Sequence, residues 1–108
     1  MSKKPYYITT TIAYASGKPH IGNTYEIIMA DAIARFKRFE GYDVFFQTGT
    51  DEHGQKIQTA AEAKGMTPQE LVDKIHVNFK ELWKVLDIGN DDFIRTTEPR
   101  HIRVVQAM

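Results

Sequence analysis

The sequence predicts an α/β fold built on a parallel sheet. Segments rich in β-branched and aromatic residues alternate with segments whose apolar residues recur at helical spacing. Loop signals of Gly, Pro and Ser separate these segments, and no stretch repeats or is low in complexity. Because strands and helices alternate, the chain is organised as strand–helix–strand crossovers, which place successive strands parallel to one another.

The first predicted crossover occupies residues 6–48. YYITTTI at residues 6–12 is predicted as one strand, and DVFFQT at residues 43–48 as the next. The helix between them is predicted over residues 24–40, with Asp31 and Arg35 one turn apart on a more polar side. The apolar residues at helical spacing predict the face that packs on the rest of the protein: Tyr25, Ile28, Met29, Ala32, Phe36 and Phe39.

Two further helices, a strand and a last helix are predicted beyond residue 54. A weak helical pattern spans residues 56–64, and Thr67-Pro68-Gln69-Glu70 predicts the capped start of a helix that reaches about residue 87. DDFIRT at residues 91–96 is predicted as a short strand, and Thr97 as the cap of the last helix. The core-facing residues predicted for the long helix are Leu71, Ile75, Phe79, Leu82 and Leu86.

Composition narrows the class of protein. A chain of 108 residues with 42% hydrophobic residues can build one core, so we expect one domain or a piece of one. Its 14 basic and 14 acidic side chains cancel, so no overall field draws it to nucleic acid or a membrane. The lack of cysteine excludes disulfides and thiolate metal sites, and the first ten residues contain no signal-peptide pattern. We expect a soluble cytoplasmic protein with no membrane partner.

The two unusual loops both follow predicted strands. AYASGKPHIGN follows the first strand and TGTDEHG overlaps the end of the second. Parallel sheets bind ligands at the carboxyl ends of their strands, so these loops are the candidate site.

The first loop has features of a phosphate site. His20 and Gly22 stand at the mouth of the predicted helix, and neither residue type favours helix formation. Free backbone N–H groups at a helix start attract anions, the glycine permits close approach, and an imidazole can donate to a phosphate oxygen. This predicts a nucleotide triphosphate at the helix start. The alternative is an ordinary surface turn, since the chain has no Walker motif and no Gly-x-Gly-x-x-Gly.

The second loop offers a carboxylate. Asp51 closely follows an apolar strand and could bind an ammonium group, or the loop could be a solvated acidic turn. Asp51, Glu52 and His53 also carry metal-ligating atoms, but they are adjacent and no other ligands cluster near them. We therefore predict no metal site.

Three stretches together resemble one family. YYITTTIAYASGKPHIGN, FFQTGTDEHGQKIQ and NDDFIRTTEPRH, in this order, are similar to the N-terminal part of bacterial methionyl-tRNA synthetases, which are class I aminoacyl-tRNA synthetases. The resemblance covers essentially the whole chain. It implies that residues 1–108 are the N-terminal part of a Rossmann-like nucleotide-binding fold, incomplete and without a second domain.

The resemblance implies an ATP site at the first loop. His20, Ile21 and Gly22 match the first three residues of the family's His-Ile-Gly-His signature, in which the histidine contacts the ATP phosphates and the glycine makes room for adenine. Asn23 stands in place of the second histidine, and an amide donates a hydrogen bond but carries no charge. His20 and Asn23 are the implied catalytic residues, and Glu26 matches an acidic position near the nucleotide.

The resemblance also implies a methionine site. Ile12 and Tyr14 match positions that line the methionine pocket, and Asp51 matches the carboxylate that binds the amino group of the substrate. Ala13 stands where many relatives have an aromatic residue.

The implied function is ATP-dependent formation of methionyl-adenylate and transfer of methionine to tRNA(Met), with Mg²⁺ accompanying ATP. The Lys-Met-Ser-Lys-Ser signature, the insertion that can carry zinc, and the anticodon-binding domain of the family lie outside this sequence. The segment alone is therefore expected to be inactive. Two other readings stay open: a non-catalytic nucleotide- or methionine-binding module, and a structural piece that pairs with its missing half or with itself.

Overall fold

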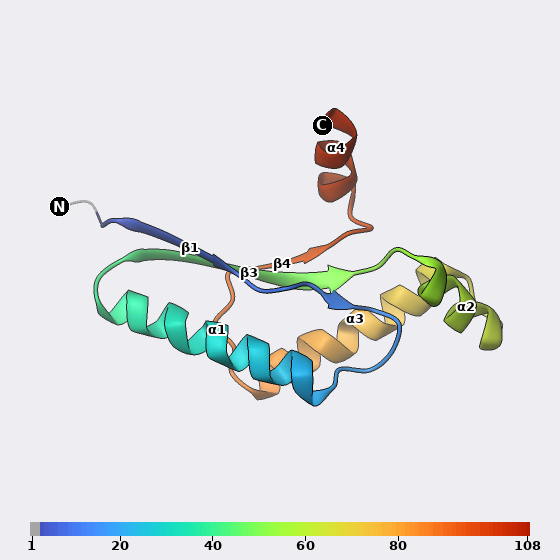
Figure 1. The fold of residues 1–108 in the computed structure, drawn as a ribbon, viewed down its shortest axis with the longest axis horizontal. Coiled ribbons are helices and arrows are strands. Elements are labelled where there is room, and N and C mark those ends of the chain that lie inside the picture. The colour runs from blue at the N-terminus through green and yellow to red at the C-terminus, as the bar shows by residue number, and fades with distance from the viewer. Residues whose placement is uncertain (1–2) are drawn as a thin grey trace.

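The computed structural model describes residues 3–108 and confirms a mixed α/β fold with a parallel sheet. Along the described residues the elements follow one another (Figure 1) as β1 (Pro5–Thr9), β2 (Ala13–Tyr14), α1 (Ile21–Phe39), β3 (Asp43–Asp51), α2 (Gln55–Ala63), α3 (Pro68–Val85), β4 (Asp92–Arg95) and α4 (Pro99–Ala107).

Strand β3 is the centre of the sheet, and all three of its partners run parallel to it. Strands β1 and β2 pair with successive parts of β3, at residues 43–47 and 50–51. Strand β4 pairs with residues 47–50 of β3. Because Gln47 pairs with both β1 and β4, and Thr50 with both β2 and β4, the strands β1 and β2 share one edge of β3 and β4 holds the other.

The predicted strand at residues 6–12 is wrong in its second half. The ladder breaks after Thr9, and pairing resumes only at Ala13. The reason is a competing contact, since the backbone N–H of Thr11 donates to Glu26 Oε1 of α1 at 2.5 Å. The break directs residues 10–12 toward the candidate site.

The predicted packing face of α1 is also wrong. The residues that α1 buries are Ile27, Ala30, Asp31 and Ala34. The predicted residues are exposed instead, and Phe39 and Tyr25 reach 90% and 70% exposure. The periodicity of apolar residues predicts that a helix has apolar stripes, but it does not predict which stripe packs against the sheet. The small side chains of Ala30 and Ala34 are buried at 7% and 0% exposure and allow a close approach of the helix, which the large aromatic stripe does not.

The buried Asp31 belongs to a polar junction. Its carboxylate accepts from Arg35 Nε at 2.8 Å and from the backbone N–H of Gly89 at 2.7 Å. The predicted pair is therefore formed, but its Asp31 member is buried while Arg35 stays exposed, and Asp31 ties α1 to the loop that precedes β4.

Helices α2 and α3 largely match the prediction. Thr67 caps α3, with a reciprocal bond from Glu70, and Leu71, Ile75 and Phe79 are buried. Leu82 and Leu86 are half-buried, while Val72 and Trp83 are buried without having been predicted. Strand β4 lies within the predicted range.

The cap of α4 differs from the prediction. Glu98, not Thr97, occupies the N-cap position. The Thr97 hydroxyl instead donates to Glu52 Oε1 at 2.6 Å, so it is used in a contact that sequence patterns do not reveal.

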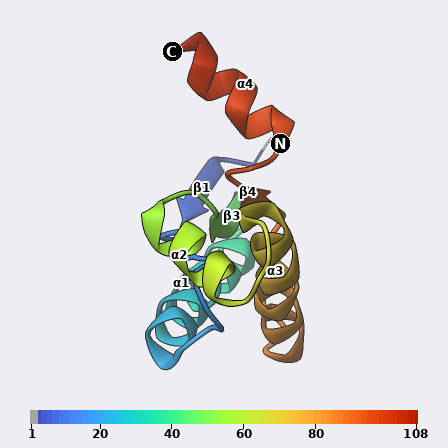
Figure 2. The same ribbon diagram turned by 90° about the vertical axis from the view of Figure 1, so that its right-hand side faces the viewer.

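Helices cover only one face of the sheet in the described part of the chain. Both ribbon views place α1 and α3 on the same side and show α4 projecting away on the other (Figures 1 and 2). On the open face, Tyr7 and Phe45 stack with ring centroids 5.7 Å apart and stay largely exposed. The segment is thus an incomplete layered fold. Between residues 3 and 108, no helix combines the length and apolar character that crossing a bilayer requires.

Candidate functional site

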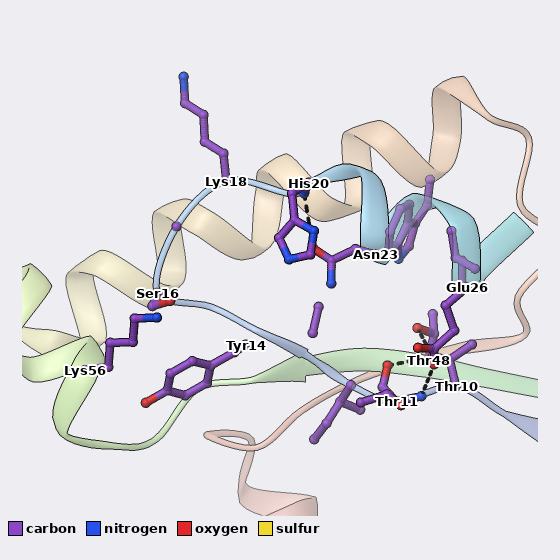
Figure 3. Close-up of a pocket in the computed structure, with 15 residues that line it drawn as sticks. Thr10, Thr11, Tyr14, Ser16, Lys18, His20, Asn23, Glu26, Thr48 and Lys56 are labelled. Atoms are coloured by element: carbon purple, nitrogen blue, oxygen red, sulfur yellow. Dashed lines mark hydrogen bonds between the residues drawn. The ribbon is translucent and has the colours of Figure 1, made fainter.

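A cavity of about 470 Å³ lies beside the break between β1 and β2. Its walls come from residues 10–14 and 16–18, the start of α1, Thr48 of β3, Lys56 of α2 and Trp83 of α3 (Figure 3). This volume is in the range of small-molecule sites.

Five of the seven predicted site residues line this cavity, and they are Ile12, Tyr14, His20, Asn23 and Glu26. Gly22 and Asp51 do not line it, but each lies next to a residue that does. Gly22 bonds to the side chain of His20, and Asp51 is the register partner of Tyr14. The structure therefore brings the two predicted loops to one place.

His20 begins helix α1, which starts three residues earlier than predicted. Its Nδ1 accepts the backbone N–H of Gly22 at 3.0 Å, and the Oδ1 of Asn23 accepts the backbone N–H of His20 at 3.1 Å. These reciprocal bonds form a capping box with His and Asn in place of the usual Ser or Thr and Glu. The expectation that His20 does not help the helix to form is wrong.

The cap fixes which nitrogen of His20 is available. Because Nδ1 accepts a backbone N–H, a neutral imidazole carries its proton on Nε2, by hydrogen-bond geometry. The His20 ring lines the cavity (Figure 3). His20 can therefore cap the helix with one nitrogen and donate to a ligand with the other.

Asn23 divides its functions in the same way. Its oxygen is used in the cap, and its amide nitrogen points into the cavity (Figure 3). The amide at the position of the signature's second histidine thus supplies a neutral donor to the same space.

Gly22 leaves space for the ring that caps the helix. A Cβ at this position would lie 2.9 Å from Cε1 and 3.1 Å from Nδ1 of the His20 ring. A side chain at this position would therefore force the His20 ring to shift from its capping position. The implied role of this glycine beside adenine remains a prediction.

Glu26 holds the wall of the cavity. Its bond to the Thr11 N–H fixes residues 10–12, which include the predicted methionine-pocket residue Ile12. Thr10 adds a hydroxyl contact of 2.8 Å to Thr48 (Figure 3). The geometry gives Glu26 a positioning role, and its implied proximity to a nucleotide stays a prediction.

Asp51 ends strand β3 with its carboxylate free. Its backbone carbonyl accepts the N–H of Ala15 at 2.9 Å, but its side chain makes no hydrogen bond or ion pair within residues 3–108. Asp51 is half-buried. A carboxylate in this state is available to a ligand.

The neighbours of Asp51 are committed to other contacts. Glu52 is buried against Arg95, and His53 Nε2 lies 3.1 Å from the carbonyl oxygen of Thr96. Over the described residues, no three His, Asp or Glu side chains are grouped so as to hold a metal ion. Sequence reasoning missed the Glu52 contacts because Arg95 is 43 residues away.

The structure explains why glycine stands at position 54, the last residue of TGTDEHG. Its φ is 132°, a conformation that other residues rarely adopt, and a Cβ would overlap the Tyr14 hydroxyl. Gly54 therefore allows Tyr14 to occupy the cavity wall.

Two lysines line the cavity that sequence reasoning did not single out. Lys56 extends toward Ser16 and Tyr14, whereas the Lys18 side chain points away from the other labelled residues (Figure 3). Within residues 3–108, neither lysine forms an ion pair. The signal in the sequence that could have identified these lysines is a basic residue close to a predicted helix start.

Comparison with known proteins shows the family to which this chain belongs. The family described as tRNA synthetases class I (M) matches residues 6–108 of this chain. The chain belongs to this family. It is 59% identical over 108 residues to the methionine–tRNA ligase of Clostridium perfringens. This match covers 100% of this chain and 17% of that protein. It is 60% identical over 106 residues to the ligase of Listeria monocytogenes, covering 98% of this chain and 16% of that protein.

A solved structure of this synthetase family has the same fold. Mycobacterium tuberculosis methionyl-tRNA synthetase, in complex with methionyl-adenylate, superposes with a TM-score of 0.91 at 50% identity. The match covers 93% of this chain and 20% of that one. The resemblance to a class I methionyl-tRNA synthetase and to the N-terminal part of its Rossmann-like domain is thereby confirmed. This chain spans about a sixth of the length of the curated relatives it matches.

Proposed function

We propose that this chain supplies the first half of the active site of a methionine–tRNA ligase. The observation that carries the proposal is that one cavity gathers residues from the His-Ile-Gly loop and lies beside Asp51 of the Thr-Asp-Glu-His-Gly loop. The structural neighbour that holds methionyl-adenylate supports it, since that compound joins a methionyl group to a nucleotide.

The cavity side of α1 fits the phosphates of ATP. His20 Nε2–H and the amide of Asn23 are neutral donors, and Lys56 adds positive charge. Such donors stabilise the charge that develops on phosphate oxygens in a transition state, and no side chain need act as a covalent nucleophile. ATP would arrive as its Mg²⁺ complex. We assign no residue of this chain to the metal.

The β2 side fits methionine. The carboxylate of Asp51 would bind the substrate ammonium group, and Ile12 and Tyr14 would contact the thioether side chain. The carboxylate of methionine would then attack the α-phosphate of ATP, forming a C–O–P linkage and releasing pyrophosphate. In a second step the methionyl group would pass to a hydroxyl of the terminal adenosine of tRNA(Met), breaking the bond to the adenylate and releasing AMP. The cytoplasmic location stays a prediction.

The test uses methionine-dependent ATP–pyrophosphate exchange in a full-length ligase that carries this segment. His20→Ala should lower kcat roughly a hundredfold, because a donor to developing charge is lost. The helix cap is lost too, so His20→Ser is the matched variant. Serine caps a helix well but is too short to reach a ligand.

The pair of variants separates the two functions of His20. We expect the Ser variant to be as slow as the Ala variant, while His101→Ala on α4 keeps normal exchange. A Ser variant with normal kcat would limit His20 to the cap. Exchange that does not depend on methionine would contradict the proposed function as a whole.

A further inference from the structure

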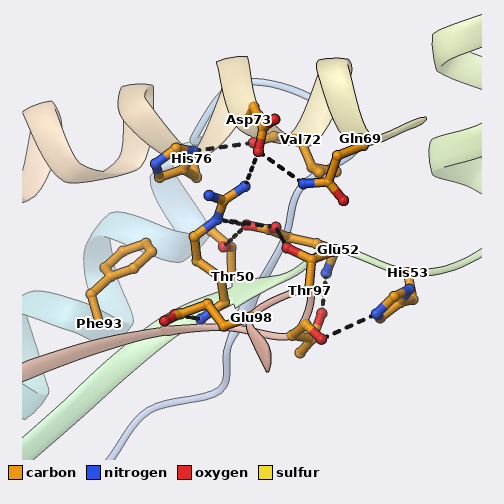
Figure 4. A network of polar contacts seen from close by, with 12 residues as sticks. Thr50, Glu52, His53, Gln69, Val72, Asp73, His76, Phe93, Thr97 and Glu98 are labelled. Carbon is orange, nitrogen blue, oxygen red and sulfur yellow. Dashed lines mark hydrogen bonds and ion pairs between the residues drawn. The ribbon is translucent and has the colours of Figure 1, made fainter. Parts of the chain in front are cut away.

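The stretch DDFIRTTE at residues 91–98 contributes no residue to the cavity, yet the structure joins it to the loop that holds Asp51. Glu52 is 3% exposed, and its side chain is fully enclosed. Oxygen Oε2 accepts from Thr50 Oγ1 at 2.5 Å and from Arg95 Nε at 2.8 Å, and Oε1 accepts from Thr97 Oγ1 at 2.6 Å (Figure 4).

Arg95 holds this carboxylate from β4. Its second arm donates from Nη2 to Asp73 Oδ1 of α3 at 2.6 Å. Burial lowers the pKa of Arg95, but the hydrogen bonds to Glu52 and Asp73 outweigh it and leave the pKa above its usual value. The guanidinium therefore stays charged and connects β3, β4 and α3.

The network has no capacity left for a ligand. A buried carboxylate is tolerated only when it is paired and hydrogen-bonded, and both oxygens of Glu52 already have such partners. Glu52 is therefore not a group that touches substrate.

The network acts on the backbone next to Asp51. The peptide unit between Asp51 and Glu52 is held at both ends, since the Asp51 carbonyl accepts from Ala15 N and the Glu52 N–H donates to Thr96 Oγ1 at 2.7 Å. The side chain of Glu52 then fixes the direction in which the chain leaves the strand. The free carboxylate of Asp51 lies one residue before this anchor.

We propose that Glu52 and Arg95 are positioning residues, which hold the backbone of Asp51 so that its carboxylate meets the amino group of the substrate. The proposal rests on the proposed function, because it requires Asp51 to bind that ammonium group. It adds a role for DDFIRTTE, which brings Arg95, Thr96 and Thr97 to the loop.

The test again uses a full-length ligase that carries this segment, with ATP–pyrophosphate exchange as the readout. Glu52→Gln keeps the shape of the side chain, but its amide N–H group would face the groups that donate to the Glu52 carboxylate. We expect the KM for methionine to rise roughly tenfold. The KM for ATP should stay within about twofold of its value in the unmodified enzyme, because only the orientation of the Asp51 carboxylate changes. Thr97→Val, which removes one donor, should give a smaller rise in the same direction and serves if the Gln variant does not fold.

A methionine analogue that lacks the α-amino group separates positioning from general damage. Its inhibition constant against exchange should be unchanged by Glu52→Gln, because the analogue has no ammonium group for Asp51 to bind. Asp43→Asn is the control, since Asp43 is an exposed residue at the opposite end of β3, outside the Glu52 network, and its replacement should leave both constants near normal.

Each outcome bears on one proposal. Equal weakening of methionine and the analogue by Glu52→Gln or Thr97→Val, or an unchanged KM for methionine in both, would overturn the positioning role. If Asp51→Ala raises the KM for methionine while those variants do not, the positioning role fails and the proposed function stands. If Asp51→Ala itself has no effect, the assigned role of Asp51 fails and the positioning role falls with it.

Discussion

Asp51 offers the most direct test of substrate binding. Replacing it with alanine removes a carboxylate that is half-buried at the end of β3 and has no partner within residues 3–108. Because it has no partner to leave unsatisfied, the change should cost little stability. Its whole effect should fall on the ligand.

The magnitude follows from the exposure of the group. A hydrogen bond to a charged group contributes about 1.5–3 kcal/mol, and partial burial places this contact toward the upper end. Since every 1.4 kcal/mol is a factor of about ten, the KM for methionine should rise roughly 30- to 150-fold. The KM for ATP should change by less than about threefold.

The assay is ATP–pyrophosphate exchange in a full-length ligase carrying the segment, with each substrate varied in turn. Asp43→Ala is the matched control, because Asp43 is an exposed aspartate at the opposite end of the same strand. Equal effects on methionine and ATP, or a normal KM for methionine, would refute the reasoning.

Three further predictions concern stability and local geometry. Gly54→Ala should displace Tyr14 and raise the KM for methionine more than that for ATP in the same exchange assay, and equal changes would contradict the contact. Asp31→Asn should weaken the junction with the loop before β4 by about 2 kcal/mol, seen as faster hydrogen exchange at residues 87–91. A hydrogen bond from Arg100 lowers the pKa of Asp92, so this pairing stabilises the fold above about pH 4 and is lost as pH falls. Arg100→Ala should raise the pKa of Asp92 in an NMR titration, and an unchanged value would show that the pair is not formed in solution.

Local patterns predicted the order and most boundaries of the elements, because caps, glycines and periodicity act over a few residues. Thr67 and Glu70 are an example, since their capping box is visible in four consecutive letters. The break after Thr9 could not be predicted, because it depends on a contact with Glu26, 15 residues from Thr11.

The candidate site was predicted in part for the same reason. The position of the two loops followed from the order of strands, and their residues do converge. The double use of His20 was not predicted, because an imidazole is an uncommon helix cap and nothing in the sequence distinguishes Nδ1 from Nε2. The role of Glu52 was hidden, since its partners Arg95 and Thr97 join it only in the folded sheet.

The exposed stripe of α1 has a consequence for synthesis on the ribosome. Ile21, Tyr25 and Phe39 present large apolar surfaces to solvent, at 87%, 70% and 90% exposure. In relatives where this segment makes up 17% of the protein, most of the chain is translated after it, over a period on the order of tens of seconds. During that interval the nascent helix carries an uncovered hydrophobic surface. Exposed apolar surface of this kind favours association with other apolar surfaces.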